Sequence, residues 1–81
     1  MIAEIDLEKF DFDYWTNNRI KTLLKIANEK TIEDTRTLSL YIGLSYASTH
    51  QIISELTEKS LIIKKGRTLT INPEWKTILK Q

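Results

Sequence analysis

The sequence predicts an α+β domain in which a three-helix core is followed by a two-stranded β-hairpin and a short C-terminal helix. Apolar residues recur at helical spacing in three stretches between about residue 16 and residue 60, and the period then changes to two over LIIKKGRTLTI, residues 61–71. The next residues, Asn72-Pro73-Glu74, have the composition of a helix start. With 81 residues and no cysteine, the chain is expected to form one domain without disulfides or cysteine-bound metals.

The chain divides into an N-terminal segment, residues 1–12, that is acidic and aromatic, and a predicted domain, residues 13–81. Residues 1–13 carry five acids and one base, a net charge of −4, whereas residues 14–81 carry eleven bases and six acids, a net charge of +5. A basic body favours a polyanionic partner. The loose alternation of the segment leaves a mobile arm, a docked strand, a helical turn and a dimerisation element open as its structure or role.

The first predicted helix runs to about Asn28, and Asp13 or Thr16 can cap its start. Its predicted core positions, at i, i+3, i+4 and i+7, are Ile20, Leu23, Leu24 and Ala27. The stretch Thr31–Thr35 that follows is polar and is predicted to be a loop.

Two further helices, joined by a short turn, predict a helix-turn-helix. Asp34 or Thr35 caps a helix over RTLSLYI, and Gly43 supplies the left-handed residue that ends it. Ser45 caps the next helix, which ends near Ser60. The residues expected to face the core are Leu38 and Ile42, with Ser39 beside them, and then Thr49, Ile52, Ile53 and Leu56.

The alternating stretch is predicted to be a β-hairpin with Lys65-Gly66 as its two-residue turn, because glycine accommodates a positive φ there. Its core face is expected to carry Leu61 and Ile63 on one strand and Leu69 and Ile71 on the other.

In this order and spacing the chain resembles the winged helix-turn-helix family of regulators, MarR-like and related archaeal and bacterial proteins. The resemblance covers roughly residues 18–79 and rests on Gly43-Leu44-Ser45, Glu58-Lys59-Ser60-Leu61-Ile62, Lys64-Lys65-Gly66-Arg67 and Asn72-Pro73-Glu74. It implies that the helix over residues 45–59 enters the major groove of DNA and that the hairpin over residues 61–71 is the wing. The chain departs from the family pattern at Ser60, where glycine is usual, and at Gln51, where many relatives carry arginine.

The outward residues of the second helix of the motif suit contacts with bases, since amide, imidazole and hydroxyl groups can bond base edges and a methyl group can touch thymine. The predicted base contacts are Ala47, His50, Gln51 and Ser54. The predicted phosphate contacts are Arg36, Ser45, Tyr46 and Ser48, and the predicted wing cations are Lys64, Lys65 and Arg67. The alternatives are a solvated polar helix face, a hairpin kept soluble by charge and, for Arg36, an ordinary surface arginine.

These features favour a sequence-specific regulator that binds double-stranded DNA, most simply a repressor that occupies a promoter. The alternative is a winged-helix module for protein–protein contact without specific DNA binding. An enzyme is not expected, because His50 has no nucleophile or orienting partner in any motif. No cofactor, metal site or small-molecule ligand is predicted.

A homodimer is predicted, because a small core cannot enclose all of the aromatic and aliphatic residues at the two ends of the chain. These residues are Phe10, Phe12, Tyr14, Trp15, Trp75, Ile78 and Leu79. The chain has no apolar run long enough for a membrane span and no signal-peptide pattern, so a cytoplasmic location, on the nucleoid when DNA is bound, is expected.

Overall fold

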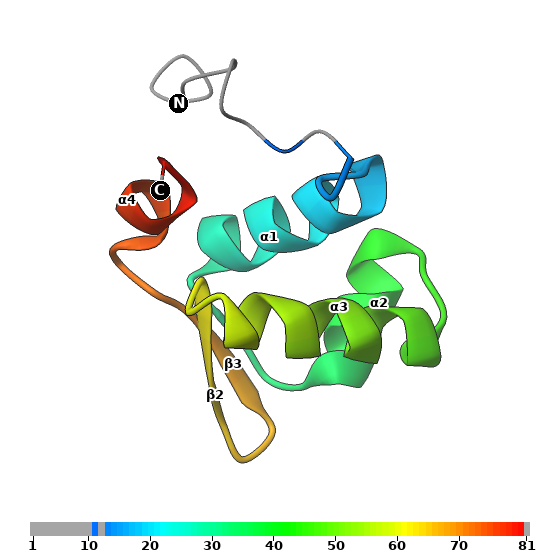
Figure 1. Ribbon diagram of the computed structural model, residues 1–81. Helices are drawn as coiled ribbons and strands as arrows, with labels where there is room; N and C mark the ends of the chain where they lie inside the picture. The colour runs from blue at the N-terminus through cyan, green and yellow to red at the C-terminus, as the bar shows by residue number, and fades with distance from the viewer. Residues whose placement is uncertain (1–10, 12, 81) are drawn as a thin grey trace.

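The computed structural model of the chain describes residue 11 and residues 13–80. Its elements are α1 (Asn17–Glu29), β1 (Thr31–Ile32), α2 (Thr35–Ile42), α3 (Tyr46–Glu58), β2 (Ile62–Lys65), β3 (Thr68–Ile71) and α4 (Trp75–Lys80) (Figure 1). The predicted α+β class, with a three-helix core, a hairpin and a short closing helix, is confirmed. The expectations for the N-terminal segment, Phe10 and Phe12 included, fall outside the described residues, apart from Asp11.

The caps of the helix-turn-helix are those expected from the sequence. The Asp34 carboxylate accepts a 2.7 Å hydrogen bond from the Thr37 N–H at the start of α2. The Ser45 hydroxyl accepts a 3.1 Å bond from the Ser48 N–H at the start of α3. Between the two helices, Gly43 has a φ of 71° and ends α2 in the left-handed conformation. The turn therefore has a fixed geometry, which sets the angle between α2 and α3.

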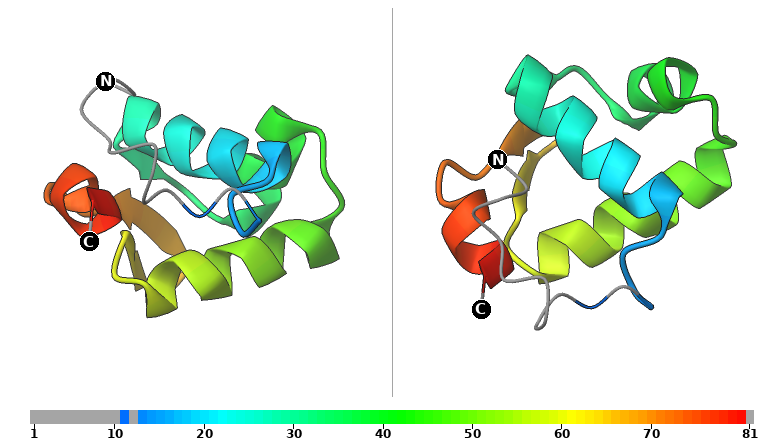
Figure 2. Two further views of the ribbon diagram at one scale, coloured as in Figure 1. Left: turned by 45° about the horizontal axis from the view of Figure 1, so that its top comes forward. Right: turned by 90° about the horizontal axis from the view of Figure 1, so that it is seen from above.

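One core joins α1, α2 and α3 to the sheet (Figure 2). Its buried hydrophobic residues are Trp15, Leu23, Ile26, Ile32, Leu38, Ile42, Ile52, Ile53, Leu56, Leu61, Ile62, Leu69 and Ile71. The predicted core faces of α2 and α3 are confirmed, with Ser39 and Thr49 buried as well. These two faces pack against each other and so hold the opposite side of α3 toward solvent.

The core face of α1 differs from the prediction. Leu24 is 36% exposed, whereas Ile26 and Thr22 are fully buried. The Thr22 hydroxyl donates a 2.7 Å hydrogen bond to the Asn18 carbonyl, so threonine can occupy the core without an unpaired polar atom. Of the predicted core residues, Leu23 is buried and Ile20 and Ala27 are partly buried against the core, so the buried stripe is shifted around the helix toward Thr22 and Ile26 and leaves only Leu24 outside it.

A third strand extends the predicted hairpin. Thr31–Ile32, predicted to be loop, forms β1 and pairs antiparallel with β3, which gives the order β1-β3-β2. Ile32 lies opposite Leu69, and both are buried. A strand of two residues is too short to show an alternating pattern, which is why the sequence did not reveal it.

The hairpin turn lies one residue later than predicted, at Gly66-Arg67, because Lys65 pairs with Thr68. Gly66 has a φ of 61° at the first central position of the turn, as in a type II′ hairpin. The buried face is also corrected: Ile62 pairs with Ile71 and is buried, whereas Ile63 is 39% exposed.

Leu61 is buried because the chain turns inward just before β2. Ser60 adopts a φ of 64°, and the Leu61 N–H then donates to the Leu56 carbonyl at 3.0 Å. Asn72 joins this corner to the end of the sheet, since its side-chain amide donates a 2.7 Å bond to the Ser60 carbonyl. The direction of the hairpin relative to α3 is therefore set at residue 60.

Candidate nucleic-acid interface

The outer face of α3, defined by Tyr46, Ala47, His50, Gln51 and Ser54, is exposed along its whole length. Thr49, Ile52 and Ile53 lie between these positions in the sequence and are buried on the opposite side. None of the five exposed residues is a lysine, arginine, aspartate or glutamate. The predicted base-contacting residues therefore share one uncharged surface.

The start of α3 is ordered by contacts between side chains. The Ser45 hydroxyl donates a 3.0 Å bond to the Ser48 hydroxyl, beside the capping bond described above. One turn further on, the Tyr46 and His50 rings stack with centroids 6.1 Å apart and an angle of 26° between their planes. The predicted phosphate-contacting residues Ser45, Tyr46 and Ser48 thus lie together at the end of the helix where backbone N–H groups and the helix dipole favour an anion.

A pocket of about 430 Å³ separates this end of α3 from the hairpin. We call it the wing groove; its lining residues are Asp34, Thr35, Arg36, Tyr46, Lys64, Gly66 and Arg67. It joins the start of α2, the first residue of α3 and the hairpin tip. Arg36 was predicted as a phosphate contact and Arg67 as a wing residue; in the structure both line the wing groove.

The wing groove carries three cations, Arg36, Lys64 and Arg67, and one carboxylate, Asp34. The pKa of Asp34 lies below its usual value, mainly because its carboxylate accepts the Thr37 N–H and also because Arg67 and Arg36 are near. The acid is thus ionised at neutral pH and offsets one of the three positive charges. The net charge of the groove is still positive. Asp34, which the sequence indicated only as a helix cap, lowers this net charge.

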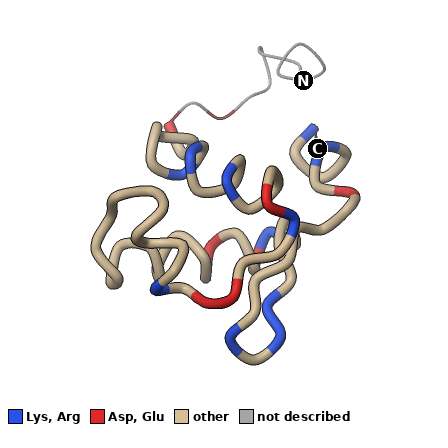
Figure 3. The backbone as a smooth tube through the Cα atoms, turned by 180° about the vertical axis from the view of Figure 1, so that it is seen from behind, with Lys and Arg blue, Asp and Glu red and all other residues tan. Residues whose placement is uncertain are grey.

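Lys65 does not line the wing groove, although it was predicted as part of one wing cluster. Lys64 lies opposite the buried Leu69, so its side chain is on the helix-facing side of the sheet. Side chains alternate along a strand, so Lys65 is on the other side with Ile63. Lysines and arginines cluster near the tip of the hairpin (Figure 3). Because side chains alternate along a strand, these cations lie on both faces of the sheet and not on one.

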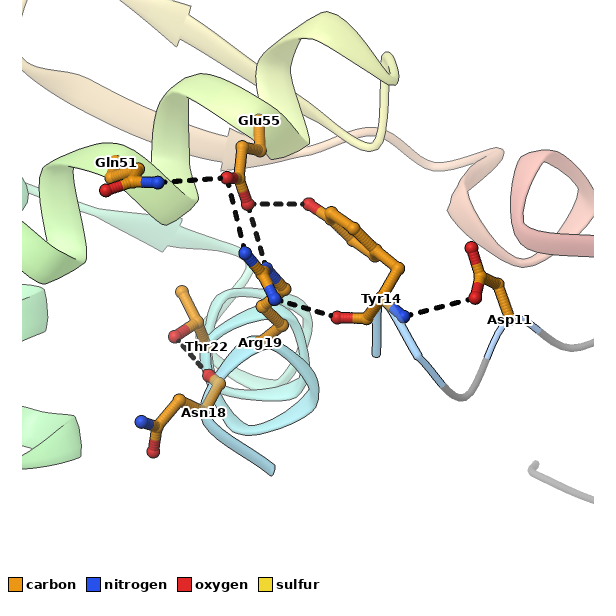
Figure 4. Close-up of polar contacts among 7 residues, drawn as sticks. All are labelled: Asp11, Tyr14, Asn18, Arg19, Thr22, Gln51 and Glu55. Carbon is orange, nitrogen blue, oxygen red and sulfur yellow. Dashed lines mark hydrogen bonds and ion pairs between the residues drawn. The ribbon is translucent and has the colours of Figure 1, made fainter. Parts of the chain in front are cut away.

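A polar network at the other edge of α3 was not predicted from the sequence (Figure 4). The Glu55 carboxylate accepts a 2.9 Å bond from Arg19 Nε and another of 2.9 Å from the Tyr14 hydroxyl. Arg19 also donates to the Tyr14 carbonyl at 3.0 Å. Gln51, on the outer face of α3, donates through Nε2 to Glu55 Oε2 at 3.4 Å. A predicted base contact is thus connected to α1 and to the turn before it.

Hydrogen bonds and burial within this network shift the pKa values of Glu55, Arg19 and Tyr14, and that of Arg19 is raised mainly by its hydrogen bond to Glu55. The Arg19 hydrogen bond is the main reason that the pKa of Glu55 is lower than usual. Burial, followed by the hydrogen bond to Glu55, raises the pKa of Tyr14 to about 12. Two cations also lie over the Tyr14 ring, Arg19 at 4.5 Å and Lys59 at 4.3 Å from its centroid. Tyr14 is therefore a neutral phenol that is held against α3.

The described residues contain no group of three or more His, Asp or Glu side chains placed to hold a metal ion. In the same part of the chain, every helix is too short or too polar to cross a lipid bilayer.

Two solved structures share this architecture. The chain superposes on RV1404 from Mycobacterium tuberculosis with a TM-score of 0.69 and 17% sequence identity, over 86% of this chain and 52% of that one. It superposes on ligand-free NadR with a TM-score of 0.71 and 14% identity, over 95% of this chain and 57% of that one. The chain thus spans little more than half the length of either protein. These likenesses confirm the winged-helix fold.

No protein-family model matches the sequence. No curated protein matches it either.

Proposed function

We propose that the chain is a sequence-specific transcriptional regulator that binds double-stranded DNA. One observation carries the proposal: the positively charged wing groove opens beside the first turn of the uncharged outer face of α3. In DNA recognition, charged side chains bind the phosphate backbone and position the protein, while neutral polar side chains can contact the base edges and determine sequence preference. RV1404 and NadR are winged-helix transcription regulators, which favours the same class for this chain.

In this proposal the wing groove binds the phosphate backbone. Arg36, Lys64 and Arg67 supply charge, and the Tyr46 hydroxyl supplies a hydrogen bond. Ser45 and Ser48 lie next to this site and contact an adjacent phosphate, where the N-terminal N–H groups of α3 also point. The contacts fix the position of α3 along the duplex and carry no sequence information themselves.

The outer face of α3 then lies in the major groove. The methyl group of Ala47 touches a thymine methyl, Gln51 bonds adenine, and His50 and Ser54 bond base edges or nearby phosphates. Tyr46 restricts the His50 ring by stacking on it, so His50 enters the major groove with reduced side-chain freedom.

In the proposal the protein represses transcription by occupying a promoter, and it binds DNA as a homodimer. A second pocket, of about 460 Å³, lies between α1 and α4. Its lining residues are Leu24, Ala27, Asn28, Lys30, Trp75 and Lys76. The partly exposed Leu24 and Trp75 make it a candidate dimer seam, and a two-fold dimer would bind an inverted repeat.

A second candidate function, a module for protein contact, is supported by the outer face of α2. Leu40 is 78% exposed and its neighbour Tyr41 is 57% exposed. Exposed aliphatic and aromatic side chains of this kind are typical of interface anchors. This face does not form part of the wing groove, so a regulator could use both surfaces.

The proposal is tested by selecting bound sequences from a random duplex pool and then measuring Kd at several salt concentrations. A preferred sequence should emerge, and Kd should rise steeply with salt because bound phosphates release counterions. Arg67→Ala should reduce the slope of log K against log salt by about one unit, whereas Lys80→Ala, in α4, should leave it unchanged. Absence of duplex binding at low salt would reject the DNA-binding function.

A further inference from the structure

We propose that Glu55 is a specificity-positioning residue that fixes which way round the Gln51 side-chain amide faces the bases, and so selects adenine over guanine at one base pair. The inference rests on the proposed DNA-binding function and deepens it by naming what orients the base-contacting side chain. It follows from the geometry of the network in Figure 4.

The Glu55 carboxylate is held by three contacts from two side chains, those of Arg19 and Tyr14. Oε1 accepts from Arg19 Nε and from the Tyr14 hydroxyl, each at 2.9 Å, and Oε2 lies 3.4 Å from Arg19 Nη2. The Glu55 and Arg19 side chains are each only 25% exposed. Their positions are therefore set by packing of α1 and its preceding turn on α3, before any DNA arrives.

Gln51 is one helical turn before Glu55, and its Nε2 lies 3.4 Å from Glu55 Oε2. An ionised carboxylate can only accept hydrogen bonds, so the NH₂ group of the amide, and not its carbonyl, must face it. A glutamine without such a partner presents either end. The Glu55 carboxylate therefore selects one of the two possible orientations of the Gln51 amide group.

The fixed orientation matches adenine. Nε2 carries two protons, so one can bond Glu55 while the other donates to adenine N7, and the free carbonyl oxygen accepts from adenine N6. Guanine presents acceptors at both N7 and O6 in the major groove. The Gln51 carbonyl oxygen would then face O6, two acceptors in contact, and guanine would be disfavoured.

The DNA test compares the wild type with Glu55→Gln, Gln51→Ala and the double variant on the selected duplex. Single base-pair replacements at each position give the discrimination between bases. Glu58→Gln is the matched control, because it makes the same change at an exposed residue of the same helix. Glu55→Gln replaces the carboxylate by a carboxamide of nearly the same shape, so it should keep the overall fold but permit both orientations of the Gln51 amide.

We expect Glu55→Gln to lower the preference for A·T over G·C about two- to tenfold at the position that Gln51→Ala identifies, as expected for loss of one side chain's ordering. The preference at the other base pairs and the slope of log K against log salt should be unchanged. Glu58→Gln should have no effect on base preference, and the double variant should show the same base preference as Gln51→Ala. Retained discrimination in Glu55→Gln, or a Gln51-sensitive position that prefers G·C, would overturn the inference while DNA binding stands.

A second measurement needs no DNA and so separates this inference from the proposed function. In the free wild-type protein, the Gln51 side-chain amide signals in an ¹⁵N–¹H NMR spectrum should move as the pH is lowered through the pKa of Glu55, which lies below its usual value because of the Arg19 hydrogen bond. The same signals should differ in Glu55→Gln and remain in place in Glu58→Gln. Gln51 signals that ignore the state of Glu55 would overturn the positioning role.

Discussion

Arg19 Nε lies 2.9 Å from Glu55 Oε1, and this ion pair joins α1 to the edge of α3 across 36 residues of sequence. Its partners are each 25% exposed and share hydrogen bonds with Tyr14, whereas the side chains of the Lys25–Glu29 pair within α1 are 34% and 41% exposed, and Lys25 also contacts the Tyr41 ring. Pairs that are partly shielded and shared in a network contribute more to stability than isolated surface pairs. The two pairs therefore provide a matched comparison.

Arg19→Ala should destabilise the fold by about 1–2 kcal/mol, because Glu55 loses its charged partner and the Tyr14 carbonyl and ring lose the guanidinium. Glu29→Gln, which removes the charge of the second pair and leaves the Lys25 contact with the Tyr41 ring, should change the free energy of unfolding by less than about 0.5 kcal/mol. Urea denaturation at neutral pH measures both. Equal effects of the two variants would show that the network is no stronger than a surface pair.

The stabilisation by Glu55 should depend on pH in a defined direction. Its pKa in the folded chain lies below the unfolded value, so the contribution is fully present above the unfolded pKa, about 4.3, and is lost as pH falls through the folded pKa. The difference in unfolding free energy between wild type and Glu55→Gln should be constant between about pH 5 and pH 7 and should shrink below about pH 4. Denaturation curves measured across this range test the sign, and a difference that grows toward acid pH would contradict it.

Ser60→Gly should stabilise the chain. Ser60 adopts a φ of 64° between α3 and β2, a conformation that costs an L-residue about 1 kcal/mol and glycine almost nothing. The melting temperature should therefore rise by about 4–8 °C for a domain of this size. The control is Ser54→Gly, within α3, where the same change should destabilise by about 0.3–0.5 kcal/mol, the difference in helix propensity between serine and glycine. A neutral or destabilising effect at residue 60 would show that the serine side chain makes a compensating contact.

Sequence patterns predicted the parts of this molecule that depend on neighbours in the chain. Asp34, Gly43 and Ser45 cap or end helices through local backbone geometry, and the core face of α3 follows from a regular apolar spacing. Patterns were misleading where a position is decided by distant packing. Ile63 is exposed because the strand enters the core through Leu61 and Ile62, after the left-handed turn at residue 60.

In the candidate site, too, the features set by local sequence were predicted and the features set by distant packing were not. Helical spacing was enough to place His50 and Gln51 on one exposed face. The wing groove could not be predicted, since the walls that Arg36 and Arg67 provide meet only in three dimensions. Glu55 appeared in the sequence as an ordinary acid on a helix, and no local pattern marked its distant partner on α1.

Dimerisation through the pocket between α1 and α4 predicts a concentration-dependent mass. Leu24 is 36% exposed there, so Leu24→Lys should leave the monomer fold nearly as stable as wild type while placing a charge in the seam. Sedimentation equilibrium at micromolar concentration should give a dimer for wild type and a monomer for the variant. The control is Leu40→Lys, on the outer face of α2, which should remain dimeric. A wild-type protein that is monomeric throughout this range would remove the prediction.

The two hairpin lysines should contribute unequally to DNA binding. Lys64 lines the wing groove with Arg36 and Arg67, whereas Lys65 is on the opposite face of β2. If the groove holds a phosphate, Lys64→Ala should reduce the salt slope by about one unit and Lys65→Ala by clearly less. The two residues are adjacent and exposed, so their variants share charge, length and strand environment and differ mainly in the face that they occupy. Kd measured from low to moderate salt would decide between them, and a larger effect of Lys65→Ala would place the phosphate outside the groove.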